Sequence, residues 1–363
     1  MKNTFGSALT VTLFGESHGP CVGALLDGLA PGIGVDEDFI AHQLTLRRPA
    51  DSLSTARREP DRFVIESGLY GGKTTGTPLC IRIPNEAQHS QDYEFYGKAR
   101  PGHADYAAYA KYHGFEDPRG GGHFSGRITA ALVAAGAIAL GALKQKNIFI
   151  GTHISRGAGI SDRPFGDLKE DLDLLSVKPF PVLDDKAEEL MKSMVLKAKE
   201  QGDSVGGILE TAVIGLPAGL GEPWFDTVES VLSHALFAIP AVKGVEFGAG
   251  FGLAAMTGSA ANDPFRMVDG HVVTETNHSG GINGGITNGM PVIFRCAMRP
   301  TPTISREQQT VDLQTKEPAV LRAVGRHDSC VVHRARIVVD CVAALVVTDM
   351  LTGRYGTDWW VEQ

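Results

Sequence analysis

Glycine-rich segments that carry histidine, serine and arginine mark the places where this chain could do chemistry. The first, residues 15–19, reads Gly-Glu-Ser-His-Gly and directly follows a predicted strand. Ser17 and His18 would therefore lie on a tight turn, where a hydroxyl and an imidazole suit proton transfer. An ordinary turn with a capping serine explains the segment equally well, and the partners of a hydrolase nucleophile elbow are not apparent.

Two neighbouring segments combine arginine with glycine. Residues 100–106 read Arg-Pro-Gly-His-Ala-Asp-Tyr, and residues 117–127 read Asp-Pro-Arg-Gly-Gly-Gly-His-Phe-Ser-Gly-Arg before an alanine-rich helical pattern. Glycine lets the backbone approach a ligand, and N–H groups at a helix N-terminus attract anions, so this region predicts an anion site. His103, His113 and His123 recur every ten residues, which does not suit a helical metal pair, and no metal is predicted.

Further segments of the same kind lie on both sides of this region. Residues 47–58 hold four arginines in an acidic protein, and guanidinium groups suit phosphate and carboxylate. Residues 277–289 hold five glycines and three asparagines, which favour a loop lying against a flat ligand. Residues 325–330 place a cation, an imidazole and a carboxylate in succession, although Asp328 could simply cap a helix. A turn and a strand start explain residues 202–207 adequately.

The composition excludes several classes of protein. With 363 residues, 43% hydrophobic and 21% charged, the chain is too long for a small stapled module and too apolar for a disordered one. Its net charge of −8 argues against a nucleic-acid binder, and five cysteines without a CxxC pair argue against a disulfide framework or a cysteine zinc site. The N-terminus lacks the apolar core of a signal peptide, and Asp340 interrupts the apolar stretch near the C-terminus, so we expect a cytoplasmic protein.

Helical and strand patterns must position these segments. Helices are predicted within residues 36–49, 128–144, 186–200, 226–239 and 336–351, and strands over residues 9–14, 62–67, 79–83, 148–154, 207–214 and 290–298. Asp36 would cap the first helix, and the Ile-Val-Val run in the last pattern would also suit a strand. Because the patterns alternate without a compositional boundary, we expect one α/β domain that gathers dispersed loops around a single site.

Taken together, eight segments resemble those of the chorismate synthase family and occur in that family's order over nearly the whole chain. They are residues 15–19, 47–49, 100–106, 117–127, 202–207, 241–248, 277–285 and 325–330. The resemblance implies a single α/β (α+β) domain over residues 1–363, built as a sandwich of antiparallel sheets and helices. It also implies a homotetramer.

An activity follows from the same resemblance. The family consists of phosphate-eliminating carbon–oxygen lyases of the shikimate pathway, which serves aromatic amino-acid biosynthesis. The enzyme would convert 5-enolpyruvylshikimate-3-phosphate to chorismate and phosphate by a 1,4-anti elimination. It would require reduced FMN although the reaction has no net redox change, and NADPH is the candidate reductant. We expect this small molecule as its partner, with no nucleic acid and no membrane.

The resemblance assigns roles to five candidate catalytic residues. His18 would act as the acid toward the substrate phosphate. His103 would protonate the reduced flavin near N1. Asp328 would assist proton movement at flavin N5, which takes the substrate's C6 hydrogen, and Ser17 and Ser125 would steer these protons.

Binding residues are implied in the same way. A phosphate and two carboxylates on the substrate, with a further phosphate on FMN, require several arginines in a dry site. The arginines that match are Arg47, Arg100, Arg127 and Arg326. The positions that match flavin contacts are His123, Phe124, Ser125, Pro240, Ala241, Gly284, Arg299, Pro300, Thr301, Pro302, Thr303 and Arg326.

Two departures from the family pattern leave questions open. Many relatives carry a further phosphate-binding arginine near the position of Leu53, where this chain has none, and Arg57 or Arg58 could replace it. His123 and Phe124 replace an Arg-Ser pair, so their flavin contacts would come from the backbone or from stacking by Phe124.

From the residues alone, two other classes of function stay open. A non-catalytic protein that binds anions or nucleotides could use the same loops, and so could a metal-dependent phosphatase with histidine and aspartate. Dependence of phosphate loss on reduced flavin, together with insensitivity to EDTA, separates the family activity from both.

Overall fold

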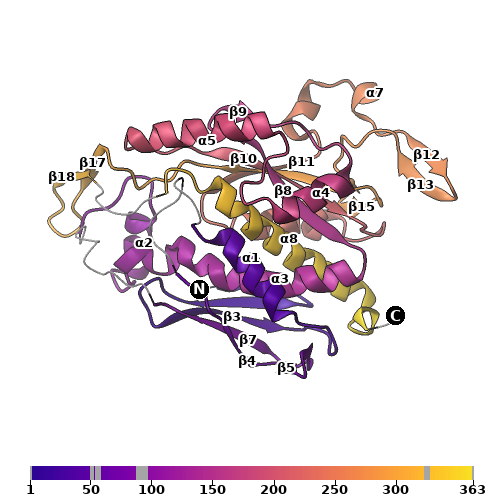
Figure 1. Ribbon diagram of the computed structural model, residues 1–363, viewed down its shortest axis with the longest axis horizontal. Coiled ribbons are helices and arrows are strands. Elements are labelled where there is room, and N and C mark those ends of the chain that lie inside the picture. Colours follow the sequence, from indigo (N-terminus) through magenta and orange to yellow (C-terminus); the bar gives the residue numbers. More distant parts are fainter. Residues whose placement is uncertain (1, 50–52, 54–58, 87–96, 323–327, 362–363) are drawn as a thin grey trace.

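The computed structural model describes residues 2–49, 53, 59–86, 97–322 and 328–361. Two five-stranded antiparallel sheets lie on either side of two long helices, α3 (Thr129–Gln145) and α8 (Val332–Tyr355), as Figure 1 shows. The first sheet has the order β1 (Thr4–Phe5), β2 (Thr10–Gly15), β3 (Cys21–Asp27), β7 (Leu79–Pro84), β4 (Val64–Ser67). The second has the order β11 (Val242–Phe247), β16 (Val292–Met298), β10 (Gly207–Ile214), β8 (Phe149–Gly157), β9 (Ile160–Ser161).

Shorter elements surround this sandwich. The other helices are α1 (Glu37–Arg47), α2 (Asp105–Tyr112), α4 (Leu168–Val177), α5 (Asp185–Glu200), α6 (Val228–Leu236) and α7 (Gly258–Ala261). The 3-10 turns are η2 (Arg119–Phe124), η3 (Gly126–Ile128), η4 (Trp224–Asp226), η5 (Gly250–Ala255) and η6 (Asp358–Trp360). Four hairpins pair β5 (Leu69–Tyr70) with β6 (Lys73–Thr74), β12 (Phe265–Val268) with β13 (His271–Thr274), β14 (Ile282–Asn283) with β15 (Ile286–Thr287), and β17 (Glu307–Val311) with β18 (Pro318–Arg322).

Small residues let the two central helices approach closely. α3 is rich in alanine and buried nearly all round, which is why its sequence shows no polar face. A Cβ atom built on Gly136 would lie only 2.3 Å from Cβ of Cys341 on α8. Only glycine therefore fits at this crossing, and the crossing fixes the spacing between the two sheets.

The apolar character of this region has a structural origin. Gly126–Gln145 is, among the described residues, the one segment long and apolar enough to cross a membrane, with a mean hydropathy of 1.7. However, 83% of its most apolar 18-residue window is buried inside the fold. Its hydropathy is that of a core helix packed between two sheets.

All five predicted helices and all six predicted strands are present, with ends shifted by a few residues. Asp36 caps α1 as expected, since its Oδ1 accepts a hydrogen bond from Phe39 N at 2.9 Å. Residues 332–355 form one continuous helix, which decides against a strand there. The sandwich of helices and antiparallel sheets confirms the predicted fold class.

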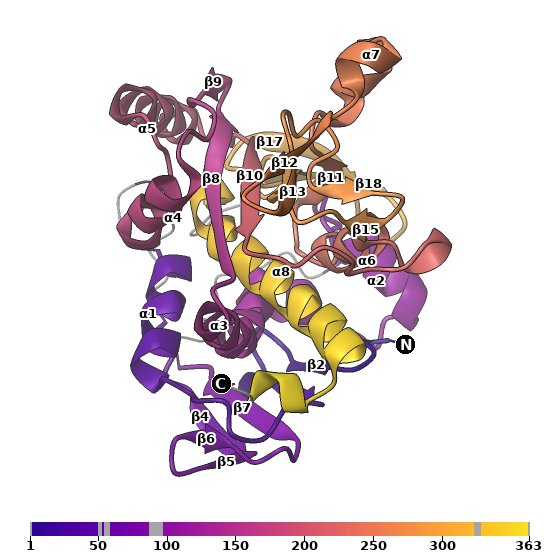
Figure 2. The ribbon, with the colours of Figure 1, turned by 90° about the vertical axis from the view of Figure 1, so that its right-hand side faces the viewer.

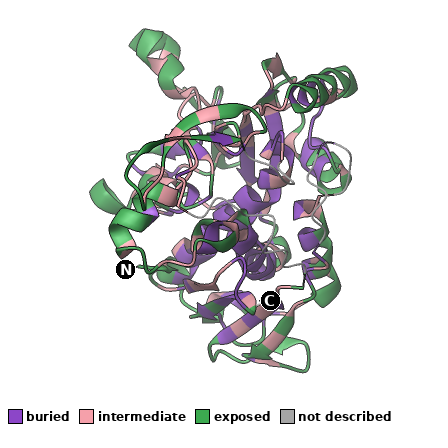
Figure 3. Ribbon diagram, turned by 90° about the vertical axis from the view of Figure 1, so that its left-hand side faces the viewer, coloured by how far each residue is buried: buried purple, intermediate pink, exposed green. Residues whose placement is uncertain are grey.

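A segment that we call the arm, residues 250–275, projects from the sandwich (Figures 1 and 2). It contains η5, α7 and the β12–β13 hairpin, and a two-stranded sheet by itself is only marginally stable in water. Figure 3 shows that buried residues concentrate around the central helices, while the projecting segments are exposed. The arm exposes the apolar side chains of Phe251, Phe265, Met267, Val268 and Val272.

The close helix crossing gives a prediction with an internal control. Gly141 also lies in α3, but a Cβ atom there would meet nothing within 4 Å. Gly141→Ala should therefore stabilise the protein by up to about 1 kcal/mol, because alanine favours the helix. Gly136→Ala should destabilise it by about 1–3 kcal/mol, because overpacking at the crossing outweighs the same helical gain. Denaturant unfolding measures both variants, and equal effects of the two would contradict the crossing argument.

Candidate active site

A turn of three glycines forms the centre of the candidate site. Gly120, Gly121 and Gly122 have φ angles of 59°, 84° and 52°, a region that other residues rarely adopt. Ser17 N donates a hydrogen bond to the carbonyl of Gly122 at 3.0 Å. A Cβ atom on Gly120 would lie 2.6 Å from Nε2 of His18 and 3.0 Å from Oγ of Ser17. The turn thus packs directly against Ser17 and His18, both of which are buried.

The next residue of the turn lies against a second pair of predicted catalytic residues. A Cβ atom on Gly121 would lie 3.6 Å from Nε2 of His103 and 3.8 Å from Cβ of Ser125. One turn therefore brings His103 and Ser125 close to Ser17 and His18, although the four are spread over a hundred residues of sequence.

His103 is held by a carboxylate that the sequence analysis did not single out. Its Nδ1 lies 2.7 Å from Oδ1 of Asp105, the first residue of α2. Arg100 donates to both oxygens of the same carboxylate, at 2.8 Å from Nε and 2.7 Å from Nη2. Burial alone would raise the pKa of Asp105, but the hydrogen bonds from Arg100 and His103 outweigh it and hold that pKa well below its usual range.

His123 and Phe124 use their side chains differently. Nδ1 of His123 donates to the carbonyl of Gly15 at 2.8 Å, which fastens the 15–19 turn to the glycine turn. The ring of Phe124 is partly exposed and meets Tyr112 edge-on, with 6.1 Å between the ring centroids. The imidazole of His123 therefore has a structural role, whereas the side chain of Phe124 stays partly exposed.

Two of the predicted substrate arginines share one buried carboxylate. Nη2 of Arg47 lies 2.7 Å from Oδ2 of Asp61, and Nη1 of Arg127 pairs with the other oxygen. All three side chains are almost completely buried. Burial would raise the pKa of Asp61, but the two guanidinium groups lower it further than burial raises it. Two cations on one anion leave this region with net positive charge.

Hydrogen bonds extend from this trio to the 15–19 turn. Nε of Arg127 donates to Oδ1 of Asn85 at 2.8 Å. Nδ2 of Asn85 donates in turn to the carbonyls of Glu16 and Gly19, at 3.0 and 2.8 Å. The position of His18 thus depends on the buried arginines as well as on the glycines.

The same network reaches the fifth predicted catalytic residue. Nη1 of Arg334 lies 2.5 Å from Oδ2 of Asp328, and its Nε donates to the carbonyl of Arg47 at 2.8 Å. Asp328 is therefore linked to the arginine trio through the first turn of α8. This arrangement brings the C-terminal motif to the N-terminal one.

The predicted flavin segment 299–303 lies against the turn that carries His103. A Cβ atom on Gly102 would lie 3.3 Å from Cβ of Pro302 and 3.5 Å from Nη1 of Arg299. Arg299 N donates to the carbonyl of Ala241 at 3.0 Å, which places the predicted contacts 240–241 beside this segment. Nε of Arg299 and Oγ1 of Thr301 are buried and have no hydrogen-bond partner among the described residues. Such donors suit an anionic, polar-edged ligand such as FMN.

Residues 202–207 contact both the 299–303 segment and the start of the C-terminal motif. A Cβ atom on Gly206 would lie 2.3 Å from the carbonyl oxygen of Met298, and Oγ of Ser204 donates to the carbonyl of Thr301 at 2.7 Å. Val205 N donates to the carbonyl of Ser329 at 2.8 Å. The segment is thus a turn and strand start, as expected, and it holds the 299–303 and 328–330 segments together.

Some predicted residues do not join this cluster or fall outside the described residues. Gly284 lies in the turn between β14 and β15, and Figure 1 shows β15 in the right half of the view and α2 in the left half. Arg57, Arg58 and Arg326 lie outside the described residues, so the predictions about them stay predictions. Asp61, Asn85, Asp105 and Arg334 were missed, and only Asp105 carried a signal, its position two residues after His103 in a recognised motif.

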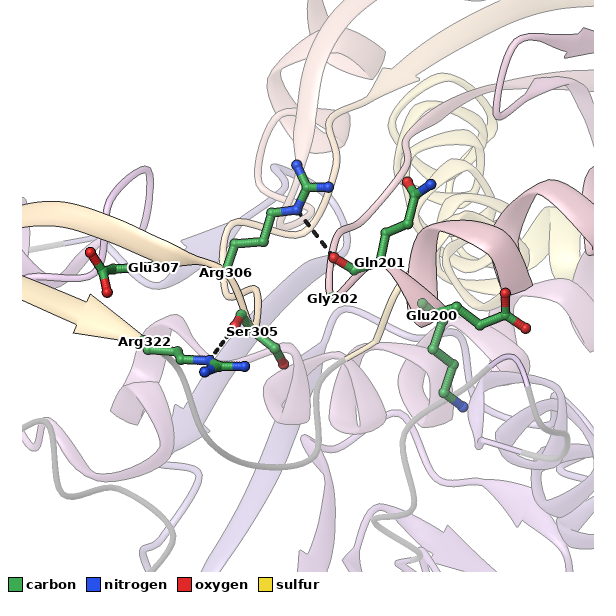
Figure 4. Close-up of a pocket in the computed structure, with 8 residues that line it drawn as sticks. Glu200, Gln201, Gly202, Ser305, Arg306, Glu307 and Arg322 are labelled. Atoms are coloured by element: carbon green, nitrogen blue, oxygen red, sulfur yellow. Dashed lines mark hydrogen bonds between the residues drawn. The ribbon is translucent and has the colours of Figure 1, made fainter.

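A separate cavity of about 480 Å³ lies between the end of α5, residues 305–307 and Arg322 (Figure 4). Its guanidinium groups are used internally: Nε of Arg306 donates to the carbonyl of Gln201 at 3.1 Å, and Nε of Arg322 to that of Ser305 at 2.8 Å. Two glutamates, Glu200 and Glu307, partly offset the three cations of its lining. None of the predicted site residues lines this cavity, and the chemistry points to the glycine turn instead.

Comparisons with known proteins agree with this geometry. The family model described as "Chorismate synthase" matches residues 9–352. A chorismate synthase from Thermococcus kodakarensis is 45% identical over 350 residues, covering 96% of this chain and 97% of that protein. One from Aeropyrum pernix is 44% identical over 364 residues, covering 99% and 96%.

A solved structure supports the same assignment. The structure titled "Crystal Structure of Chorismate Synthase" matches with a TM-score of 0.74 and 30% identity, over 97% of this chain and 94% of that one. The similarity therefore extends through both sheets and every segment of the candidate site that the structure describes. On the sequence match, the fold and the gathered motifs together, the chain belongs to the chorismate synthase family.

Proposed function

We propose that the side chains around the glycine turn form the centre at which this chain carries out the reaction of its family. The chain is a phosphate-eliminating lyase of the shikimate pathway, and its family requires reduced FMN. One observation carries the assignment: Gly120 packs on His18 and Ser17, while Gly121 packs on His103 and Ser125. Two imidazoles at adjacent residues of one turn can serve two ligands that lie side by side.

His18 is proposed as the acid that assists the departure of phosphate. Phosphate leaves more readily when its charge is neutralised or protonated, and a buried imidazole can deliver that proton without competition from water. His18 is 4% exposed, and the hydrogen bond from His123 to the carbonyl of Gly15 fastens the 15–19 turn that carries it. Ser17, which is also buried, lies beside the ring to orient the proton.

The buried arginines are proposed to hold the anionic groups of the substrate. Arg47 and Arg127 carry more positive charge than Asp61 cancels, and Nε of Arg47 is buried without a partner among the described residues. In a dry site such excess charge attracts phosphate and carboxylate strongly. Arg100 and Arg326 are proposed to add to this attraction, and Arg57 or Arg58 to replace the arginine absent near Leu53.

Reduced FMN is proposed to lie against residues 299–303, with His123 to Ser125, Pro240, Ala241 and Arg326 as further contacts. Gly284 does not lie in this cluster, so its flavin contact stays a prediction. Arg299 and Thr301 supply buried donors that the described residues leave unused. Reduced FMN, when bound, supplies an electron-rich ring that assists phosphate loss and takes up the C6 hydrogen of the substrate. His103 would hold or deliver a proton at its Nε2, and Asp328 would accept one.

Replacing each histidine tests this assignment. His18→Ala and His103→Ala should each lower turnover by on the order of 10²–10⁴, the range for losing a positioned acid or base. Chorismate formation from the enolpyruvyl substrate with photoreduced FMN under anaerobic conditions is the measurement. His42→Ala, an exposed histidine on α1, is the matched control and should keep wild-type turnover.

The contrary results are specific. Wild-type turnover in a folded His18→Ala or His103→Ala variant would remove that histidine from the mechanism. Release of phosphate without chorismate, or loss of activity on adding EDTA, would favour a metal-dependent phosphatase. Binding of the substrate with no turnover at all in the wild type would favour a non-catalytic protein.

The arm suggests how copies of the chain assemble, and we propose a homotetramer. A projecting hairpin with exposed apolar side chains gains stability when it packs against another protomer. Light scattering should give about four times the chain mass of 38.6 kDa. Met267→Asp on the arm should lower that mass, while Val177→Asp at the exposed end of α4 should not. A monomeric wild type, or an unchanged mass for Met267→Asp, would contradict the proposal.

Three finer assignments complete the proposal. NADPH is the candidate reductant of the bound flavin, and the chain works in the cytoplasm. One domain over residues 1–363 is proposed, and it is supported by a single cluster of buried apolar residues that extends, among the described residues, from Leu9 to Trp360.

A further inference from the structure

We infer that Asp105 is a positioning residue for His103, which keeps the proton of the neutral imidazole on Nδ1 and leaves Nε2 as the nitrogen that exchanges protons in the site. The inference rests on the proposed function, in which His103 moves a proton. Asp105 itself contacts neither substrate nor flavin in this account, and it acts only through the histidine.

The geometry at Nδ1 fixes the position of the proton. Nδ1 of His103 lies 2.7 Å from Oδ1 of Asp105. Nη2 of Arg100, a donor, lies 3.0 Å from the same nitrogen, but it donates to Oδ1 of Asp105 at the shorter distance of 2.7 Å. A bare nitrogen and a carboxylate oxygen would repel each other at 2.7 Å, because both would present lone pairs. A proton on Nδ1 turns the same contact into a charge-assisted hydrogen bond. The neutral ring therefore carries its free lone pair on Nε2.

The carboxylate is held firmly enough to perform this task. Its Oδ2 accepts from the backbone N of Arg100 at 2.9 Å and from Nε of Arg100 at 2.8 Å. Its Oδ1 accepts from Nη2 of Arg100 at 2.7 Å and from Nδ1 of His103. Asp105 is also the first residue of α2, where the helix N-terminus favours negative charge. Four donors and the helix end keep it ionised and immobile.

The opposite nitrogen of the ring faces the candidate site. A Cβ atom on Gly121 would lie 3.6 Å from Nε2 of His103, so this nitrogen lies against the glycine turn. Gly102, the residue before His103, lies against Arg299 and Pro302 of the proposed flavin segment. The ring thus has one nitrogen fastened to Asp105 and the other beside the place where ligands are proposed to bind.

A second aspartate in the same chain provides a matched control. Asp171 lies in the first turn of α4 and, like Asp105, binds one arginine through both oxygens. Its contacts are Nη2 of Arg163 at 2.5 Å, Nη1 of Arg163 at 3.0 Å and the backbone N of Gly166 at 2.8 Å. No histidine is hydrogen-bonded to it among the described residues. Replacing it removes the same kind of clamp without touching His103.

The test is a double-mutant cycle on the full-length enzyme, with Asp105→Asn, His103→Ala, their combination and Asp171→Asn. Asp105→Asn should lower kcat by about 10- to 100-fold, part of the range that a positioned acid or base contributes. In the His103→Ala background the same substitution should have no further effect, because its target is gone. Asp171→Asn should stay within about twofold of the wild type, and thermal unfolding should show all four variants folded.

A second measurement needs neither flavin nor turnover. In protein labelled with ¹⁵N-histidine, the signals of His103 are those absent from His103→Ala. Near pH 8 they should report a proton on Nδ1 in the wild type, and a shift of the proton toward Nε2 in Asp105→Asn. The Asp171→Asn spectrum should match the wild type.

The contrary outcomes are distinct. The inference is overturned if Asp105→Asn keeps the wild-type kcat. It is also overturned if Asp105→Asn lowers kcat as much in the His103→Ala background as in the wild type, or if His103 has the same tautomer in the wild type and in Asp105→Asn. If His103→Ala loses turnover while Asp105→Asn does not, only this inference fails. If His103→Ala itself keeps wild-type turnover, the proposed role of His103 fails, and the inference fails with it.

Discussion

Three consecutive glycines with positive φ are the constraint on which the candidate site depends. At Gly120 the backbone approaches the His18 ring so closely that a methyl group would lie 2.6 Å from it, and at Gly122 one would lie 2.0 Å from the carbonyl of Asp117. No other residue satisfies both the dihedral angles and the space. Folding restricts the backbone of this turn, which costs conformational entropy. In return the turn packs against both His18 and His103, which lie far apart in the sequence.

A network of buried charged side chains also holds the candidate site in place. Asp61 lies between Arg47 and Arg127, and the resulting network runs from Arg334 and Asp328 to the 15–19 turn. Removing one partner from such a buried set leaves a charge uncompensated, which is costly. The same excess of positive charge is what an anionic substrate requires. If these arginines bind the substrate as proposed, stability and binding depend on the same residues.

The sequence predicted local structure well where a local signal existed. Asp36 and the apolar spacing behind it predicted α1, and alternation at Leu79, Ile81 and Ile83 predicted β7. β3 was missed because Gly23 interrupts its apolar pattern. A Cβ atom at this position would lie 2.1 Å from the ring of Phe14, so the strand needs glycine there for packing. Asp61 was missed because its partners lie 14 and 66 residues away, and no periodicity reveals such pairing. The motifs identified the family and most of the residues that the structure brings together around the glycine turn, whereas the residues that position them became visible only in three dimensions.

The turnover of Gly120→Ala relative to Gly126→Ala tests whether the glycine turn positions the two histidines. Both glycines lie in the segment 117–127, but a Cβ atom on Gly126 would meet nothing within 4 Å and its φ is not positive. If the glycine turn positions the histidines, Gly120→Ala should lose chorismate formation by on the order of 10² or more, while Gly126→Ala stays close to the wild type and both keep their thermal unfolding transitions. Wild-type turnover in a folded Gly120→Ala variant would contradict the account.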